Sequence, residues 1–370
     1  MELLGILRTL PDAVLQQLLA SLWDEEKGED PFYSPTESDQ VFSSVMAGVR
    51  SRHHLLWPRV AAAFAFVLLG GLCFWFLNQS TNSANKQAVQ LYGANKPIIE
   101  PGSDKAVFIS EAGEVVDLKN LREGTPLQQA GAVLTRETDG TIVYQPSLNS
   151  NRHEAVKSWP ILKTPRGGQC PFRLPDGSQV WLNAASSISF APDFPHGSRQ
   201  VKVSGEVYFE VSKDPHIPFE VLVDGARVQV LGTRFNISAY EDDGAVVTTL
   251  LEGAVKVRDE REEKQLHPGQ QASIAANERI IVRNLSNPQD AIAWKTGYFQ
   301  FNDSDIASIM RQVSRWYDVS VTYEGGVPSK KLTGAIPRHV DLKQLLDVLA
   351  YSRMQFSVRG REIIVKNTSR

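Results

Sequence analysis

A long apolar run near the N-terminus constrains this chain of 370 residues more than any other feature. The run is WPRVAAAFAFVLLGGLCFWFLN, residues 57–78, and every residue from Val60 to Leu77 is apolar or glycine. A helix of about 18 residues is about 27 Å long, close to the thickness of the hydrocarbon core of a bilayer. A buried core helix is the alternative, but the aromatic cluster at residues 74–76 is typical of a membrane interface. We therefore predict one transmembrane helix over residues 55–78.

The charges that flank this run predict its orientation. Arg50, Arg52 and Arg59 precede the apolar residues, whereas no basic residue follows until Lys86. Because basic residues are retained on the cytoplasmic side during insertion, the N-terminus is expected inside the cell. A signal peptide is disfavoured, because the run begins far from the N-terminus and NQSTNSANK is a poor cleavage site. The prediction is a single-pass protein with an internal segment, residues 1–54, and an external part that begins with a polar linker, residues 79–97.

The internal segment contains leucines at helical spacing in acidic surroundings. Its acidic residues outnumber its basic ones before Arg50, and two prolines interrupt it after the first helix. An acidic amphipathic helix with little core of its own is typical of a segment that binds a basic partner, and an ordinary solvated tail is the alternative. The candidate contact residues are Leu15, Leu18, Leu19, Leu22 and Trp23.

The external part begins with a long β-rich region, residues 98–290. Stretches such as VKVSG, FEVLV, RVQVLG and AVKVRD alternate apolar and polar residues, and they recur about every 8 to 12 residues between turn residues. Residues 101–118 also align without a gap with residues 165–182, so that Phe108 matches Phe172 and Gly113 matches Gly177. Each copy is predicted to be a hairpin with glycine in its turn. The repetition favours a stacked, solenoid-like β architecture over a single sandwich.

The last segment, residues 296–370, changes to helical periodicity. One apolar stripe is predicted to begin at Asp303 or Ser304 and a second at Asp341, and each is followed by an alternating strand. This pattern predicts a small α+β domain built from a repeated β-α-β unit. Its core should contain the two stripes, Ile306, Ile309, Met310, Val313 and Trp316 in the first helix and Leu342, Leu345, Leu346 and Leu349 in the second.

Catalytic and metal-binding patterns are not found in the sequence. The seven histidines are scattered, no H-E-x-x-H or C-x-x-C motif occurs, and GARVQVLGTRF lacks the pattern of a phosphate-binding loop. Cys73 lies in the predicted span and Cys170 outside it, so no disulfide is expected. A thiol nucleophile at Cys170 and carboxylate pairs such as Asp242 with Asp243 are alternatives without a local signature. With a net charge of −3, the prediction is a protein without enzymatic activity, metal, cofactor or direct contact with nucleic acid.

Several stretches resemble one family closely. TPRGGQCPFRLPDGSQVWLNAASSISF, RQVKVSGEVYFEVSKDPHIPFEV, VQVLGTRFNISAYED, TTLLEGAVKV and LHPGQQASI resemble the periplasmic domain of FecR-type anti-sigma regulators, most densely over residues 159–275. IEPGSDKAVFISEAGEVVDL resembles the upstream repeat of the glycan- and siderophore-responsive branch. YFQFNDSDIASIMRQVSRWYDVSVTYE is similar to the C-terminal domain of that branch, which is related to the short N-terminal domain of secretins and TonB-dependent receptors.

The resemblance implies a relay across the inner membrane. In such families a TonB-dependent outer-membrane transporter contacts the periplasmic part through its signalling domain, and an extracytoplasmic-function sigma factor is released or activated in the cytoplasm. Such a relay controls the transcription of genes for the uptake of glycans or iron-siderophores. In several members periplasmic and intramembrane proteases take part. Gly70 and Gly71 would then weaken the span helix for such a protease, and close helix packing is their alternative role.

Two other classes of function remain open on the sequence. One is a membrane-anchored periplasmic β-solenoid that binds or hydrolyses carbohydrate, for which Trp159, Trp181 and Tyr208 would supply an aromatic platform. Alternation places most of these side chains in the core, which disfavours this class. The other is an envelope scaffold whose terminal domain assembles like a secretin ring.

Overall fold

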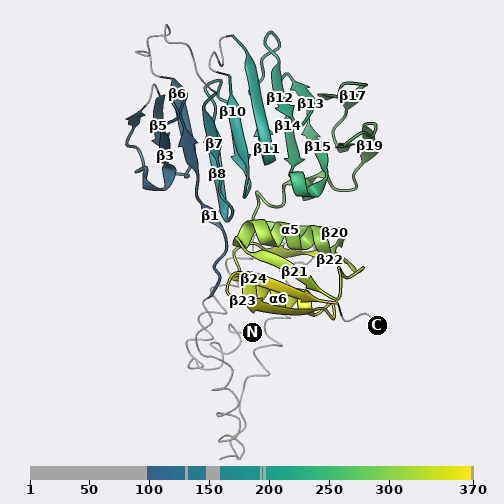
Figure 1. The fold of residues 1–370 in the computed structure, drawn as a ribbon. Helices are drawn as coiled ribbons and strands as arrows, with labels where there is room; N and C mark the ends of the chain where they lie inside the picture. Colours follow the sequence, from purple (N-terminus) through teal and green to yellow (C-terminus); the bar gives the residue numbers. More distant parts are fainter. Residues whose placement is uncertain (1–97, 130–131, 147–158, 192–193, 195–196, 368–370) are drawn as a thin grey trace, which may run out of the picture. The chain divides into compact units, whose positions relative to one another are not determined.

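The computed structural model describes residues 98–367, apart from 130–131, 147–158, 192–193 and 195–196. Asn95–Arg370 forms one compact unit, and Figure 1 shows its strands and helices. No helix of the described part is long and apolar enough to cross a membrane. The predicted span at residues 55–78 lies outside the described residues, as do the candidate residues Leu15, Leu18, Leu19, Leu22, Trp23, Gly70 and Gly71.

The all-β domain contains two long sheets. The strands of the first sheet are β2 (Val107–Ile109), β3 (Val115–Asp117), β7 (Ile161–Lys163), β10 (Ser187–Phe190), β11 (Arg199–Glu210), β12 (Phe219–Val223), β13 (Ala226–Val230), β16 (Val255–Arg258) and β17 (Glu263–Leu266). They lie in the order β3-β2-β7-β10-β11-β12-β13-β16-β17. Every pair in this sheet is antiparallel except β11 with β12.

The second sheet shares strand β11 with the first. Its remaining strands are β4 (Leu127–Gln129), β5 (Ala132–Arg136), β6 (Ile142–Pro146), β8 (Gly168–Arg173), β9 (Gln179–Leu182), β14 (Arg234–Ala239), β15 (Ala245–Glu252), β18 (Gln270–Ala275) and β19 (Ile281–Asn284). The order is β4-β5-β6-β8-β9-β11-β14-β15-β18-β19. From β12 onward the hairpins alternate between the two sheets. The all-β prediction is confirmed. The solenoid-like stack that the repeat favoured is not what forms, because the strands of both sheets bury their side chains in one shared core.

Strand β11 belongs to both sheets. Its first half pairs with β10 and β12, and its second half, from Gly205 on, pairs with β9 and β14. Gly205 has a φ of +80°, and a Cβ at this position would lie 2.5 Å from Oγ of Ser186 and 2.8 Å from the carbonyl oxygen of Ala185. Only glycine tolerates both the dihedral angle and the close approach. The bend at Gly205 places the next residue, Glu206, at the start of the second sheet.

The core of the all-β domain lies between the two sheets. Every second residue of β12 and of β13 is buried, which is the period of a strand with one face in the core. Aromatic rings contact one another across the layers: Phe172 of β8 lies 6.2 Å from Phe190 of β10, and Phe209 of β11 lies 5.9 Å from Phe219 of β12, between ring centroids. Burial of one such ring contributes about 1.5–3 kcal/mol.

The predicted sequence repeat is present as two similar hairpins. Phe108 in β2 and Phe172 in β8 are both buried, and Gly113 and Gly177 in the two turns both have positive φ. The hairpins nevertheless belong to different sheets, because β2 and β3 are in the first sheet and β8 and β9 in the second. The repeat therefore predicted the local structure, and its two copies face the shared core from opposite layers.

The α+β domain follows through a short 3-10 helix, η3 (Pro288–Ile292). Its elements, green to yellow in Figure 1, are β20 (Tyr298–Asp305), α5 (Ile306–Tyr317), β21 (Ser320–Glu324), β22 (Lys331–Pro337), α6 (Leu342–Ala350), β23 (Gln355–Arg359) and β24 (Glu362–Lys366). Strand β20 pairs with β22, and a second sheet has the order β21-β24-β23. The predicted pair of β-α-β units is confirmed.

The two helices bury the predicted stripes. All nine predicted core side chains are buried in one cluster between the helices and the strands. Asp341 caps α6 as predicted, accepting a hydrogen bond at 2.9 Å from the amide of Gln344. The predicted cap of α5 at Asp303 or Ser304 is wrong: Asp305 accepts from the amide of Ser308 at 2.8 Å. The helix begins later because β20 continues through these residues to Asp305.

Candidate functional site

A buried arginine joins the α+β domain to the all-β domain. Arg338 directly follows β22 and is only 4% exposed. Its guanidinium carbon lies 3.7 Å from the ring centroid of Trp316 and 5.4 Å from that of Phe299. Nη1 donates to the carbonyl oxygen of Trp294 at 2.9 Å, and Nη2 donates to Oδ1 of Asn183 at 2.8 Å. Arg338 therefore connects its own domain to the end of β9 in the all-β domain.

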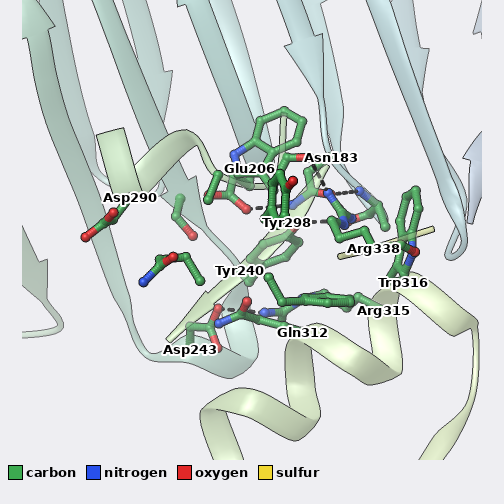
Figure 2. Close-up of a pocket in the computed structure, with 16 residues that line it drawn as sticks. Asn183, Glu206, Tyr240, Asp243, Asp290, Tyr298, Gln312, Arg315, Trp316 and Arg338 are labelled. Carbon is green, nitrogen blue, oxygen red and sulfur yellow. Dashed lines mark hydrogen bonds and ion pairs between the residues drawn. The ribbon is translucent and has the colours of Figure 1, made fainter. Parts of the chain in front are cut away.

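Asn183 also binds a carboxylate at the bend of β11. Its Nδ2 donates to Oε2 of Glu206 at 2.7 Å, and Nδ2 of Asn236 donates to Oε1 at 3.0 Å. Nε1 of Trp294 donates to Oδ1 of Asn236 at 3.3 Å. Figure 2 shows Asn183 between Glu206 and Arg338. The amide of Asn183 thus bridges a carboxylate and a guanidinium that make no direct ion pair.

The environment of these two charges shifts their pKa values in opposite senses. Burial raises the pKa of the Glu206 carboxyl, and this shift is opposed by the hydrogen bonds from Asn236 and Asn183 and by the charges of Arg338 and Arg315. Burial also lowers the pKa of Arg338 to about 10, opposed first by the charge of Glu206. Loss of water destabilises the charged form of each group, and the opposite charge nearby restores part of that free energy.

A small polar cavity of about 120 Å³ lies beside Glu206, between the two domains (Figure 2). The hydroxyl of Tyr240 donates to the carbonyl oxygen of Ala184 at 2.8 Å, and the guanidinium carbon of Arg315 lies 3.7 Å from the Tyr240 ring centroid. Burial raises the pKa of the Tyr240 phenol. The described part of the chain contains no group of three or more His, Cys, Asp or Glu residues that could hold a metal ion. The arrangement positions charges across a domain junction.

Ion pairs strengthen the same junction along α5. Arg315 pairs with Asp242 at 2.8 Å and with Asp243 at 3.0 Å, and Nε of Arg311 lies 2.6 Å from Asp243. The two aspartates belong to the 3-10 helix η2 (Glu241–Asp243) that follows β14. Both aspartates are exposed, as expected for a charged, turn-like stretch. Their ion pairs with two arginines four residues apart on α5 could not be predicted, because no local signal links segments so distant in the chain.

The three aromatic residues considered for a carbohydrate platform lie outside the two core clusters of the described residues. Trp181 and Tyr208 are cross-strand neighbours on the outer face of the second sheet. Nζ of Lys295 lies 3.8 Å from the Trp181 ring centroid and 4.8 Å from that of Tyr208, and Nζ of Lys202 lies 4.0 Å from that of Trp159. Lysine side chains of the chain itself therefore occupy the ring faces that a sugar would need. Of the three, Tyr208 is buried as alternation predicted, whereas Trp159 and Trp181 are half-buried, so the expectation that most of them lie in the core is wrong.

The comparisons with known proteins match both parts of this junction. Residues 161–256 match the family model described as FecR protein, and residues 298–365 match the model described as FecR, C-terminal. The chain contains a FecR domain and a FecR C-terminal domain. Two crystal structures, at 1.65 Å and 2.50 Å, of a "putative anti-sigma factor" from Parabacteroides distasonis also match this chain, each with 27% identity and a TM-score of 0.53. Each match covers 56% of this chain and 99% of the other. No curated protein matches the chain.

The FecR domain and the FecR C-terminal domain supply opposite sides of the network. Asn183, Glu206 and Asn236 belong to the FecR domain, whereas Arg338 and Trp316 belong to the FecR C-terminal domain. None of these residues was singled out as functional from the sequence. The only signal for them in the sequence is the presence of polar residues in or beside alternating β-strands. That pattern also fits an ordinary solvated face of a sheet, so it does not indicate a functional site.

Replacement of Arg338 by alanine should lower the free energy of unfolding by about 1–3 kcal/mol, because buried Asn183 would lose its hydrogen-bond donor and half-buried Glu206 its nearby cation. The measurement is urea unfolding of the full-length protein in detergent, followed by tryptophan fluorescence. Arg359→Ala, at an exposed position of β23 in the same domain, is the control and should change stability by less than about 0.5 kcal/mol. Equal losses in both variants would contradict the structural role of Arg338.

Glu206 should give the protein a pH-dependent stability. Because its pKa is raised in the folded state, the folded protein holds this proton more tightly than the unfolded chain does. The contribution of Glu206 to the free energy of unfolding therefore falls as pH rises from the ordinary value of 4.5 through the raised pKa. Relative to the wild type, Glu206→Gln should thus become progressively more stable over this range. Unfolding measured from pH 4 to 8 tests this, with exposed Glu260→Gln as the control; a pH-independent difference for Glu206→Gln would refute it.

Proposed function

We propose that this protein is a single-pass inner-membrane anti-sigma factor. It relays a periplasmic signal from a TonB-dependent outer-membrane transporter to an extracytoplasmic-function sigma factor, and so controls genes for uptake of a glycan or an iron-siderophore. The N-terminal segment, residues 1–54, is in the cytoplasm, and the FecR and FecR C-terminal domains are in the periplasm. The family match and the similarity to a protein titled as an anti-sigma factor support the regulatory part of this proposal.

The buried network at Arg338 is the observation that carries the proposal. A relay needs energetic coupling between the domain that receives the signal and the domain that passes it on. A hydrogen bond joins buried Arg338 on one side to buried Asn183 on the other, and Asn183 in turn donates to Glu206. A partner that displaced the FecR C-terminal domain would leave these groups unpaired, at a cost of about 1–3 kcal/mol for each group. The two domains therefore respond to one another.

The FecR C-terminal domain has strands suited to a protein partner. In its described three-stranded sheet, β21 and β23 are the edges on either side of β24. A signalling domain of a transporter can add a strand to such an edge through backbone hydrogen bonds. Periplasmic and intramembrane proteases complete the proposed relay, the latter acting near Gly70 and Gly71.

The first test concerns the cytoplasmic half. Full-length protein should co-purify with the sigma factor encoded beside its gene. The double variant Leu18→Asp, Leu22→Asp should bind at least about tenfold more weakly, because it places two charges in the apolar stripe that includes Leu15, Leu19 and Trp23. Gln17→Asp adds a charge away from this stripe and is the matched control. Unchanged binding by the double variant would exclude this helix as the sigma-factor contact.

The second test concerns the periplasmic half. A chain without residues 296–370 should lose binding to the N-terminal signalling domain of the transporter encoded nearby, measured by co-purification from membranes. The same truncated chain should retain the sigma factor, because the proposed sigma contact lies in residues 1–54. Retained transporter binding would contradict the assignment of the receiving surface to the FecR C-terminal domain.

A further inference from the structure

The segment that leads from the N-terminal half into the periplasmic domains is held by the FecR C-terminal domain, which is far away in the sequence. Ile99 is 7% exposed and packs in the core cluster of that domain, whereas its neighbour Ile98 is 70% exposed. The amide of Leu342 donates to the carbonyl oxygen of Ile99 at 3.1 Å. Leu342 is the first residue of α6, and the first amides of a helix have no partner within the helix. Ile99 supplies that partner.

Further along, the same segment passes from one domain to the other. Gly102 lies against the Trp316 ring, since a Cβ at this position would be 2.5 Å from Cε3 of Trp316. The next residues form β1 (Ser103–Asp104), which pairs in parallel with β8 of the FecR domain. The amide of Ser103 donates to the carbonyl oxygen of Gly167 at 3.0 Å. We call residues 99–104 the strap, because one end is fixed to each domain.

Trp316 connects the strap to the buried arginine. Its ring carbons meet Gly102, the Arg338 guanidinium lies 3.7 Å from its ring centroid, and its Nε1 donates to the carbonyl oxygen of Arg338 at 2.9 Å. A movement of α5 that disturbs the Arg338 network would therefore also disturb the contact between Gly102 and the Trp316 ring. The strap and the junction therefore share one aromatic side chain.

We propose that the strap is the element that passes the state of the FecR C-terminal domain to the membrane side of the protein. While Ile99 and Gly102 keep these contacts, the strap is fixed to both domains. When a partner shifts the FecR C-terminal domain, Ile99 leaves the core of that domain and the strap is released from it. This inference rests on the proposed function and adds to it a specific intramolecular contact that is broken on signalling.

The seating of the strap is tested by amide hydrogen exchange of the full-length protein in nanodiscs, resolved to single residues by fragmentation. Ile99→Ala should speed exchange of the Leu342 amide by roughly tenfold or more, because the Ile99 carbonyl is its hydrogen-bond partner. The Leu345 amide, which donates within α6 to Asp341 at 3.1 Å, should be unchanged. Ile98→Ala is the matched control and should leave both amides as in the wild type. Unchanged exchange at Leu342 in Ile99→Ala would overturn the strap.

The transmission is tested in cells with a reporter gene driven by the sigma factor encoded beside the gene. Ile99→Ala and, independently, Gly102→Ala should each change reporter activity at least about threefold from the wild-type level, whereas Ile98→Ala should not. Wild-type activity in a variant whose Leu342 amide is deprotected would overturn the proposal and leave the proposed function intact. A reporter that does not respond to complete removal of the regulator would refute the proposed function itself, and with it this inference.

Discussion

The guanidinium of Arg338 is almost completely removed from water, and the arrangement of the FecR domain and the FecR C-terminal domain depends on what it binds. Taking an ion out of water costs several kcal/mol, which is recovered only when its hydrogen bonds and opposing charges are well placed. For Arg338 this free energy is recovered by hydrogen bonds to Asn183 and to the Trp294 carbonyl, by the charge of Glu206, and by the contact with the Trp316 ring. A buried polar network of this kind is stable only when all its partners are present. Nη1 and Nη2 of Arg338 have such partners, whereas its buried Nε has none.

The remainder of the described structure positions this network. The change of sheet of β11 at Gly205 places Glu206 where β11 begins to pair with β14, and the end of β9 brings Asn183 beside it. The ion pairs from Arg311 and Arg315 to η2 hold α5 against the same face. Because Trp316 lies on α5 and contacts both Arg338 and Gly102, it also joins residues 99–104 to the junction.

Much of the local structure could be predicted, because short-range physics determines it. Alternating residues predicted the strands, glycine predicted the hairpin turns at Gly113 and Gly177, and apolar spacing predicted α5 and α6. The junction could not be predicted in the same way. Asp242 pairs with Arg315, and Asn183 pairs with Arg338, over separations that leave no pattern in the sequence. The start of α5 was placed too early because several residues before it can cap a helix, and only the pairing of β20 shows that Asp305 does so.

The sequence by itself determined the order of segments along the chain: an apolar run with positive charges before it, then a β-rich region with an internal repeat, then a β-α-β repeat. These features depend on the hydrophobicity and turn preference of neighbouring residues, which are properties of the linear chain. Only the tertiary structure decided that Arg338 meets Asn183 and that Ile99 enters the core of the FecR C-terminal domain. Both contacts require segments distant in sequence to be buried against one another. The free energy of such burial depends on the complete set of surrounding partners, and no single segment contains that information.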